Sequence, residues 1–484
     1  MASPEALLKY EMTIGIESHV QLKTATKLFS PADNDAREAE PNACVHPIDY
    51  GLPGMLPLLN KEAVDLAIKA GKAMNCQIAN VSRFDRKHYF YPDLPNGYQI
   101  TQMYHPTILA GAVEAPLEDG STVKVRIHHA HLEADAGKLT HFSSYTLADY
   151  NRTGTPLIEI VTEPDIHSAE AAKAFCQELH RLMIYAGVSY GDLYHGNQRF
   201  DVNISVAPKD STELGKRAEV KNLNSFRSIE RAIHYEFNRQ VDLLEAGERV
   251  VQETRGWHDA KQVTFSQRSK EDAHDYRYMP DPDIPPVVLE DDYIAEVQAT
   301  VPMLPPEYRA KWAGLGADSS VVNSLLNTEQ FAKSVTEIQA RAGDNAAKRV
   351  ANWFASAVGT GGDTEGSHVA EYTTETDDLI ALSEMTEKSE ISSSAAKDIF
   401  NELLNGATGP RALAESKNLL QVSDEGAIAK IVDEVLADPA SAASVADIKA
   451  GKDKAIGYLV GQIMKRSQGK ANPALAQKLI RERL

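Results

Sequence analysis

The chain has 484 residues, of which 43% are hydrophobic and 25% are charged, and its formal net charge is −19. This length exceeds one ordinary hydrophobic core and predicts roughly two to four domains, and the composition is typical of a soluble globular protein. The acidic balance argues against a protein that coats nucleic acid through its whole surface, and no apolar run approaches the roughly 20 residues of a membrane span.

The start of the chain and its cysteines favour a cytoplasmic location. The first residues, MASPEALLKYEM, lack the apolar stretch after a basic start that marks a secretory signal. Cys44, Cys76 and Cys176 are far apart and odd in number, which suits a reducing compartment. They supply neither a disulfide framework nor a cysteine zinc site. We therefore expect a cytoplasmic protein without a membrane segment.

Up to about residue 290 the chain reads as an α+β domain. Two long helical patterns occupy residues 60–74 and 168–187. Alternation of apolar and polar residues predicts four strands, at 13–22, 123–129, 156–161 and 199–206. Alternation, rather than solid apolar runs, favours an antiparallel sheet with one covered face.

The rest of the chain reads as helical and follows two proline-rich stretches, MPDPDIPP and VPMLPPEY, which predict an exposed linker. In ISSSAAKDIFNELLNG the apolar residues recur at helical spacing between serines and a glycine. Asn472 and Pro473 are placed to cap and open the last helix. With a second boundary at Gly409–Pro410, the predicted domains span residues 1–295, 296–409 and 410–484.

An apolar strand face becomes an ionisable face in the stretch VKVRIHHAHLEAD. Side chains alternate along a strand with a period of two, so Val123, Val125 and Ile127 share one side. The same parity continues through four ionisable residues: His129, His131, Glu133 and Asp135. The strand therefore either runs out into water or ends in a functional site.

Three other predicted strands also carry ionisable residues on a polar face. Glu17 and His19 share the polar parity of TIGIESHVQL, and Asp201 has the polar parity of RFDVNISV. Glu159 is the only polar residue in PLIEIV, where an ionised carboxylate costs several kcal/mol unless it is paired or metal-bound. Antiparallel sheets commonly have a wet face, so polar residues on it are also compatible with plain solvent exposure.

If the polar faces converge, they form an oxygen-rich cluster with one imidazole: Glu17, His19, Glu133, Glu159 and Asp201. Such ligands suit Mg²⁺ or Mn²⁺ better than Zn²⁺, because carboxylate oxygens dominate and thiolate is absent. Carboxylate-bound Mg²⁺ with open positions usually holds phosphate oxygens. The chain contains no complete G-x-x-x-x-G-K-[ST] loop and no G-x-S-x-G elbow, so a nucleotide would be held outside a P-loop.

The end of the chain is basic although the whole chain is acidic. Residues 447–484 carry nine Lys/Arg against three Asp/Glu, a local net charge of +6. In its last turn the stretch DKAIGYLVGQIMKRSQG presents Lys465 and Arg466, and Lys470 follows. These cations are compatible either with a nucleic-acid contact or with a solvated helical face.

Several ordered stretches together resemble the B-subunit family of the aspartyl/glutamyl-tRNA amidotransferases, heterotrimers that convert misacylated tRNA to its amide form. The resemblance covers nearly the whole chain, and the ordered set of motifs is far more specific than any one of them. The stretches are IGIESHVQLKTATKLFSPA, GLPGMLPLLN, FYPDLPNGYQITQ, HLEADAGKL, DYNRTGTPLIEIVTEPD, KNLNSF, DYRYMPDPDIPP and DIKAGKDKAIGYLVGQIMKRSQGKANP.

The resemblance implies a cradle-shaped α+β domain with an antiparallel sheet, an all-α helical domain and a small all-α tail that contacts tRNA. It implies ATP-dependent phosphorylation of the side-chain carboxylate of Glu-tRNA(Gln), Asp-tRNA(Asn) or both, followed by attack of ammonia. The implied metal and nucleotide site falls on the cluster already found by parity, with Mg²⁺ and ATP as cofactors. Tyr98 and Gln99 lie in a loop implied to be near the site, although plain packing fits Tyr98 equally. Lys138 is a candidate for phosphate charge, although an exposed structural lysine fits it equally.

The chain departs from the family pattern at several positions. Many members carry paired cysteines of a zinc knuckle, whereas Ser30 replaces the first here and only Cys44 remains before GLPG. We therefore expect no structural zinc, with His46 as a loop residue. Ala134 stands where many relatives carry a second carboxylate, which leaves Glu133 and Asp135.

The chain lacks an amidase's Gly/Ser-rich run and a recognisable glutaminase cysteine, so it should have no ammonia source of its own. The implied partners are an amidase A subunit, a small C subunit and the misacylated tRNA. Two hypotheses of different class stay open at this point. The chain is either the kinase and transamidase subunit of the complex, or a tRNA-binding scaffold whose acidic cluster holds a structural metal.

Overall fold

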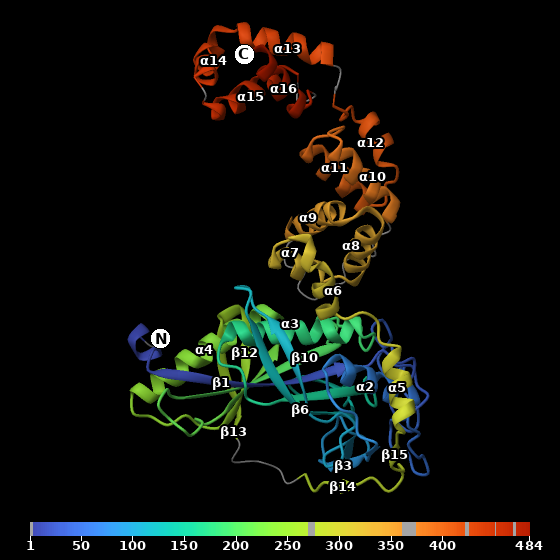
Figure 1. Cartoon of the computed structure of the whole chain (residues 1–484). Helices are drawn as coiled ribbons and strands as arrows, with labels where there is room; N and C mark the ends of the chain where they lie inside the picture. Colours follow the sequence, from blue (N-terminus) through green and yellow to red (C-terminus); the bar gives the residue numbers. More distant parts are fainter. Residues whose placement is uncertain (1–2, 270–275, 361–373, 422–424, 451, 468–470) are drawn as a thin grey trace. The chain divides into compact units, whose positions relative to one another are not determined.

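The computed structural model describes residues 3–269, 276–360, 374–421, 425–450, 452–467 and 471–484. The chain divides into two compact units, and the change from one to the other falls between Arg309 and Ala310. The first unit combines a large sheet with helices, and the second is helical (Figure 1). The predicted α+β class is therefore confirmed. The three-domain boundaries at residues 295 and 409 stay predictions.

An eight-stranded sheet forms the first unit, in the order β13-β12-β11-β10-β1-β9-β6-β5. All neighbouring strands pair antiparallel except β11 and β12, which are parallel. The strands are β1 (Tyr10–Gln21), β5 (Gly111–Pro116), β6 (Thr122–Ala134), β9 (Pro156–Thr162), β10 (Gln198–Pro208), β11 (Ala218–Leu223), β12 (Glu253–His258) and β13 (Val263–Ser269).

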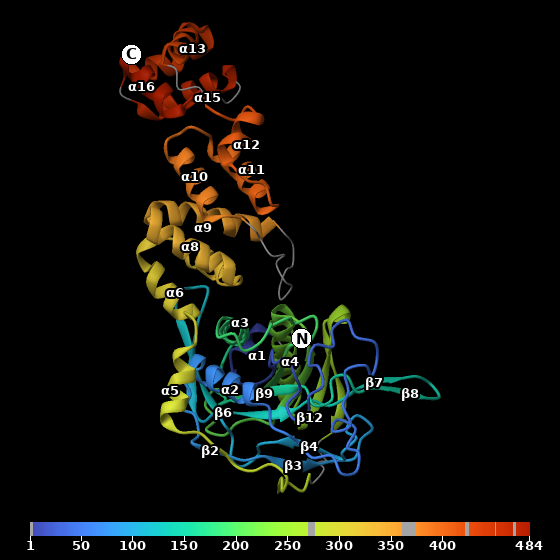
Figure 2. The same cartoon turned by 90° about the vertical axis from the view of Figure 1, so that its right-hand side faces the viewer.

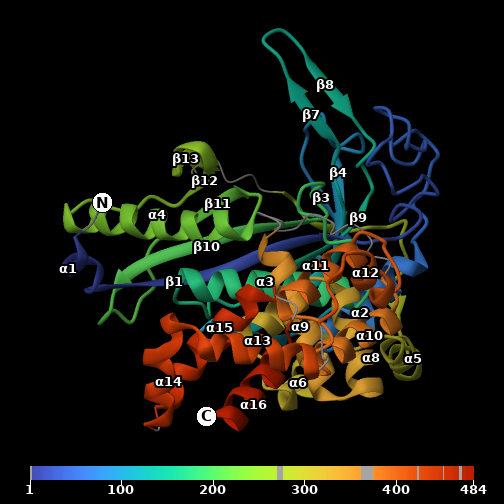
Figure 3. The same cartoon turned by 90° about the horizontal axis from the view of Figure 1, so that it is seen from above.

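Helices cover one face of this sheet. The long helices α3 (Ala169–Tyr185) and α4 (Phe226–Glu245) lie against it in Figures 1 and 3, and Ser168 and Ser225 cap them. Because strand side chains alternate, the apolar parity of the central strands meets these helices and is buried, as Ile14 and Ile16 illustrate. The other parity, which contains Glu17 and His19, is only partly covered.

Smaller β elements lie on the other side of the large sheet (Figure 2). The sheet β14-β3-β4 contains β3 (Asp85–His88), β4 (Tyr98–Thr101) and β14 (Met279–Pro280), and β2 (Val81–Ser82) pairs with β15 (Val287–Val288). A separate hairpin, β7 (Lys138–His141) with β8 (Thr146–Asp149), projects from the first unit in Figures 2 and 3. The stretch MPDPDIPP, predicted as an exposed linker, instead contributes β14 and precedes β15, because backbone pairing fastens it to this unit.

Four further helices belong to or end the first unit: α1 (Pro4–Leu7), α2 (Lys61–Ala73), α5 (Asp291–Ala299) and α6 (Pro305–Trp312). Arg309 in α6 donates from Nη1 and Nη2 to the buried carboxylate of Glu178 in α3, at 2.6 Å for each bond. Asn60 caps α2, since its Oδ1 accepts from Glu62 N at 2.9 Å.

The second unit contains helices throughout its described length. They are α7 (Ser319–Leu325), α8 (Glu329–Ala342), α9 (Asp344–Thr360), α10 (Thr376–Glu387), α11 (Ser393–Leu404), α12 (Pro410–Ser416), α13 (Glu425–Ala437), α14 (Ala442–Lys449), α15 (Ile456–Arg466) and α16 (Pro473–Arg483). Short 3₁₀ turns lie at Ala313–Leu315, Pro439–Ser441 and Asp453–Ala455 in this unit, and at Asp259–Lys261 in the first unit. Among the described residues, we find no helix long and apolar enough to cross a membrane.

The end of the chain has a hydrophobic core of its own, built from α13, α15 and α16. Val432, Leu459 and Ile480 are fully buried in it. The predicted cap of the last helix is confirmed, because Asn472 Oδ1 accepts from the backbone N–H groups of Ala474 and Leu475. Helix α12 packs against α10 and α11 instead, so the core of the tail begins after it.

Candidate functional site

The four strands that carry the predicted site residues are neighbours in the large sheet, in the order β10-β1-β9-β6. Antiparallel register places Glu17 opposite Asp201 and His19 opposite Glu159. It also places His131 opposite Glu159 across β6 and β9. The polar faces therefore converge on the side of the sheet that α3 and α4 leave uncovered.

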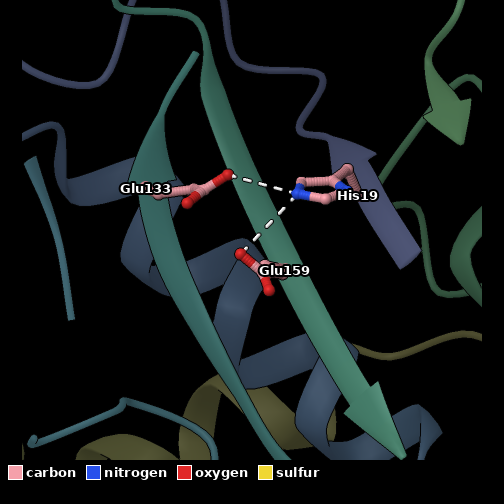
Figure 4. A group of neighbouring side chains, drawn as sticks. All are labelled: His19, Glu133 and Glu159. Carbon is pink, nitrogen blue, oxygen red and sulfur yellow. Dashed lines mark ion pairs between the residues drawn. The ribbon is translucent and has the colours of Figure 1, made fainter. Parts of the chain in front are cut away.

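One group of site residues consists of His19, Glu133 and Glu159 (Figure 4). His19 Nε2 lies 3.6 Å from Glu133 Oε1 and 3.6 Å from Glu159 Oε2. Each of the three residues offers a ligand atom, and these atoms lie within 4.8 Å of one another. The Glu133 side chain is only 5% exposed, so its carboxylate needs the partners that surround it.

His131 joins this group, although the sequence did not assign it to the site. Its Nε2 lies 3.4 Å from Glu159 Oε2 and 3.8 Å from Glu133 Oε2. Its Nδ1 is buried and has no hydrogen-bond partner among the described residues. The signal was present in the sequence, because His131 has the same strand parity as Glu133. The predicted continuation of the Val125 and Ile127 face into these residues is wrong, since a register irregularity between Ile127 and His129 puts Ala130 and Leu132 into the core instead. The structure thus adds a second imidazole to the group.

These contacts shift the pKa values of the group. Burial alone would lower the pKa of His131, but hydrogen bonds and charge interactions with Glu133 and Glu159 raise it to about 9. The pKa of His19 is raised in the same way, mainly by its hydrogen bond to Glu159 against the cost of burial. Burial opposes ionisation of Glu159, yet the two imidazoles hold its pKa well below its usual range. Glu159 is therefore an ionised carboxylate between two imidazoles.

A second group lies beside the first and contains Glu17, Asp201 and Glu219. Lys221 Nζ lies 2.9 Å from Asp201 Oδ2 and 3.1 Å from Glu219 Oε1, so it neutralises part of the negative charge. Burial and the neighbouring Glu159 raise the pKa of Glu17. The five residues predicted as one cluster thus fall into two adjacent groups, and Glu219 and Lys221 are additions that no parity argument had selected.

A cavity of about 340 Å³ adjoins both groups. Its polar lining includes His19, the carboxylates of Glu133, Asp135 and Asp201, and the cations Arg199 and Lys221. The remaining lining residues are Tyr89, Gln99, Ala136, Leu157, Phe200, Asn222, Leu223 and Asn224. Acidic and basic side chains thus face the same space. A ligand that carries negative charge together with a divalent cation matches such a lining.

The three residues predicted to assist at the site lie in different places. Gln99 lines the cavity, and its Nε2 donates to the Ala134 carbonyl at 3.0 Å. Tyr98 and Gln99 lie on strand β4 rather than in the predicted loop. Tyr98 lines a smaller neighbouring cavity, with the Arg86 guanidinium 4.3 Å from the centroid of its ring. Lys138 lies on the exposed strand β7, outside the lining of the larger cavity. Their functional roles stay predictions.

The residues at the family's cysteine positions lie in loops of the first unit. Ser30 is buried, Cys44 is half-buried, and Cys44 N donates to Asn151 Oδ1 at 2.8 Å. His46 Nδ1 accepts from Ile48 N at 3.2 Å within its loop. Asp135, the carboxylate beyond Ala134, lies 3.1 Å from Arg152 Nε and 3.5 Å from Arg199 Nη2. The expected absence of zinc stays a prediction.

The donor atoms fit a hard divalent cation. Glu133 and Glu159 supply carboxylate oxygens and His19 supplies an imidazole nitrogen, and these three atoms lie within 4.8 Å of one another. Carboxylate-rich sites favour Mg²⁺ or Mn²⁺, and imidazole is compatible with Mn²⁺ as well as with softer metals. Asp201 is less available than predicted, because it is paired with Lys221.

Comparison with known proteins identifies the family. Residues 12–295 match the GatB/GatE catalytic domain, and residues 334–484 match the GatB domain. Proteins named as the B subunit of aspartyl/glutamyl-tRNA(Asn/Gln) amidotransferase are similar over the whole length. The one from Carboxydothermus hydrogenoformans is 41% identical over 98% of this chain and 99% of its own. A Synechococcus protein is 44% identical over 100% of this chain and 99% of its own, and the Alkalilimnicola ehrlichii protein is 44% identical over 99% and 100%. The chain belongs to the B-subunit family of the aspartyl/glutamyl-tRNA(Asn/Gln) amidotransferases.

Proposed function

We propose that this chain phosphorylates the side-chain carboxylate of Glu-tRNA(Gln), Asp-tRNA(Asn) or both with ATP and then directs ammonia to the activated acyl group. The supporting observation is the convergence of two carboxylates and two imidazoles beside a cavity that the cations Arg199 and Lys221 also line. A structural metal site needs no such cavity. Binding of a phosphorylated substrate does need a cavity, and the family membership favours this catalytic function over the scaffold function.

Two displacements complete the proposed reaction. An oxygen of the substrate carboxylate attacks the γ-phosphorus of ATP, the bond from that phosphorus to the bridging oxygen breaks, and ADP leaves with the electron pair. Ammonia nitrogen then attacks the acyl carbon, the bond to the phosphate oxygen breaks, and the phosphate leaves with the proton lost by nitrogen. Phosphorylation is needed because a free carboxylate is a poor acyl donor.

The residues of the first group would hold Mg²⁺ through His19, Glu133 and Glu159, with Glu17 and Asp201 next to them. When bound, a divalent cation neutralises charge that develops on phosphoryl oxygens. His131 fixes the orientation of Glu159 from the neighbouring strand, and Gln99 supports the backbone at Ala134. These contacts hold the first group on strands, where geometry is more rigid than on loops.

Ammonia and the acceptor RNA would come from partners. Because the sequence lacks an amidase nucleophile, we propose an amidase A subunit as the source of ammonia and a small C subunit as a third member of a cytoplasmic complex. The basic tail would contact the tRNA. The relatives' designation as a B subunit itself indicates an assembly of several subunits.

The proposal is tested by Glu159→Gln in the complex reconstituted with the A and C subunits. We expect ATP hydrolysis that depends on misacylated tRNA to fall by about two orders of magnitude or more, because the buried imidazoles lose their charged partner. Binding of tRNA should be retained. Glu114→Gln, on an exposed position of β5, is the matched control and should behave as the parent chain. Normal turnover by Glu159→Gln would instead favour the scaffold function.

A further inference from the structure

Three neighbouring segments of the first unit present large apolar side chains to solvent, and the reaction proposed above does not use them. They are residues 50–58, residues 89–97 and residues 137–147, the last of which form most of the hairpin β7–β8. The large apolar residues that are 45% to 80% exposed are Leu52, Met55, Leu56, Leu58, Phe90, Tyr91, Phe142, Tyr145 and Leu147. Most side chains of these types are buried in monomeric proteins, so a group of this size indicates a binding surface.

Packing at their bases holds the three segments side by side. Tyr150, at the end of the hairpin, donates from its hydroxyl to the Pro92 carbonyl at 2.8 Å. The ring of Tyr50 packs edge-on against that of Tyr150, with centroids 5.7 Å apart, and Met55 and Leu94 line the same small cavity. Figure 3 shows the hairpin and the blue loops before α2 at the same end of the first unit, away from α1. We call the exposed residues of the three segments the apolar loop surface.

The apolar loop surface is poor in charge. Its three segments contain only two charged residues, Asp93 and Lys138, although 25% of the whole chain is charged. RNA binding depends on several cations that neutralise phosphates, and one lysine does not supply them. The cores of protein–protein interfaces, in contrast, are depleted in charge and enriched in aromatic residues and methionine. The composition therefore favours a protein partner over RNA.

The size of the surface suits a stable complex. The exposed parts of the nine residues amount to on the order of 1,000 Å², comparable to the share of about 800 Å² that each partner contributes to a standard interface. The rings of Phe142 and Tyr145 stack with centroids 4.7 Å apart, which restricts both side chains before any partner binds. Preorganised aromatic side chains are the usual anchors of such interfaces.

The apolar loop surface also borders the candidate functional site. Tyr89, in the second segment, lines the cavity together with His19 and Glu133. Gly137, where the third segment starts, follows Ala136, another lining residue. A protein seated on this surface would therefore lie at the edge of the cavity. Because ammonia is small and is lost to protonation and dilution in water, a source of ammonia has to lie next to the cavity in which it reacts.

We propose that the apolar loop surface is the docking site of the amidase A subunit. The assignment rests on the proposed function, which already needs a partner that supplies ammonia, and it adds the surface that holds this partner. Aromatic and aliphatic side chains from three segments, rather than ion pairs, would form the contact. Its affinity should therefore depend little on salt, unlike the binding of tRNA.

The full chain with Leu56→Asp or Tyr145→Asp tests the surface from two of its segments. Each variant places a charge in the apolar contact, so its affinity for the purified A subunit, with the C subunit present, should fall about 10-fold or more. Leu8→Asp is the matched control, because Leu8 is also exposed but follows α1, outside the apolar loop surface. The control should bind as the parent does, and all three variants should retain tRNA binding. Parent-like affinity of both surface variants for the A subunit would overturn the proposal.

The nitrogen donor separates loss of docking from damage to the reaction site. At limiting A subunit, amidation driven by glutamine should fall about 10-fold in the surface variants, in parallel with the affinity. Amidation driven by free ammonia needs no A subunit and should stay at the parent rate. Equal losses with both donors would show that the substitutions disturb the cavity and would overturn the docking site. If the parent chain itself makes no amide with ammonia and ATP, the proposed function fails instead.

A photo-crosslinker in the hairpin identifies the occupant directly. Tyr145 is replaced by the photoreactive amino acid p-benzoylphenylalanine, which keeps an aromatic side chain at this exposed position. The complex reconstituted from this chain, the A and C subunits and tRNA is then irradiated, and we expect a crosslink to the A subunit. A crosslink to the C subunit, to tRNA or to a second copy of this chain instead, or no crosslink to the A subunit, would overturn the proposal.

Discussion

His131 Nε2 lies 3.4 Å from Oε2 of Glu159, the residue directly opposite it across β6 and β9. The pair is cross-strand, so its geometry is set by backbone register rather than by a flexible loop. His19 approaches the same carboxylate oxygen from β1, at 3.6 Å. Glu159 is thus held between imidazoles from the strands on either side of it, which explains how a carboxylate persists in an otherwise apolar strand.

The role of His131 can be tested by His131→Asn in the reconstituted complex. We expect tRNA-dependent ATP hydrolysis to fall about 10- to 100-fold, because Glu159 and Glu133 lose a charged hydrogen-bond partner. Binding of tRNA should not change. His128→Asn is a matched control on the same strand, since His128 is exposed and its Nδ1 contacts His129 Nδ1. Equal effects of the two variants would exclude His131 from the site.

The His131 ion pairs also predict how stability depends on pH. The folded-state pKa of about 9 lies above the ordinary histidine value of about 6.5, so the pairing stabilises the fold fully below about pH 6.5. The contribution is lost as pH rises through about 9. Urea unfolding of the metal-free chain should therefore show a larger destabilisation by His131→Asn at pH 6 than at pH 9.5. A difference that is constant across this range would contradict the raised pKa.

The isolated chain should make no amide from glutamine, yet it should use free ammonia slowly. The reason is that the sequence lacks an amidase nucleophile set, whereas the residues of the candidate phosphorylation site lie together. The measurement is amidation of misacylated tRNA with either nitrogen donor, by chain purified free of the A subunit. Glutamine-driven amidation by that preparation would overturn the division of labour between subunits.

Removal of the basic tail should weaken tRNA binding and leave ATP binding intact. Many of its cations already pair within the tail: Arg466 contacts Asp438, and Arg481 contacts Asp453 at 3.1 Å. Lys465, for which the described residues provide no ion pair, is the better candidate for a phosphate contact, and Lys470 lies outside the described residues. Each phosphate contact adds about one unit to the salt dependence of binding.

The structure determines where the tail should be cut. A deletion of residues 411–484 would remove most of α12 together with Lys417, although Arg411 pairs with Glu390 and Lys417 pairs with Glu402 in α11. Deleting residues 422–484 leaves α12 in place and removes the separate hydrophobic core. Binding of tRNA is then measured across a salt series, with Lys465→Gln as the point variant and Lys333→Gln on α8 as its control. Unchanged affinity and slope would mean that the tail is only a solvated helical face.

Local patterns in the sequence were sufficient to predict the four central strands β1, β6, β9 and β10 and several helices. Alternation placed Glu17 and His19 on the polar side of β1, and Asn472 and Pro473 predicted the start of α16. Such predictions succeed because side-chain parity and helix capping depend on a few neighbouring residues. The ordered motifs also predicted the family that the comparisons confirmed.

Contacts between residues far apart in the chain decided the rest. Strand order and register are not encoded by any single strand. They placed Asp201 outside the Glu159 group and next to Lys221. They also brought His131 to Glu159, although its parity alone was equally compatible with exposure to water. The sequence thus determined the alternation along β1, β9 and β10. The irregularity in β6 and the packing of β10, β1, β9 and β6 determined which polar side chains meet, because the distance between two charges depends on partners from distant parts of the chain.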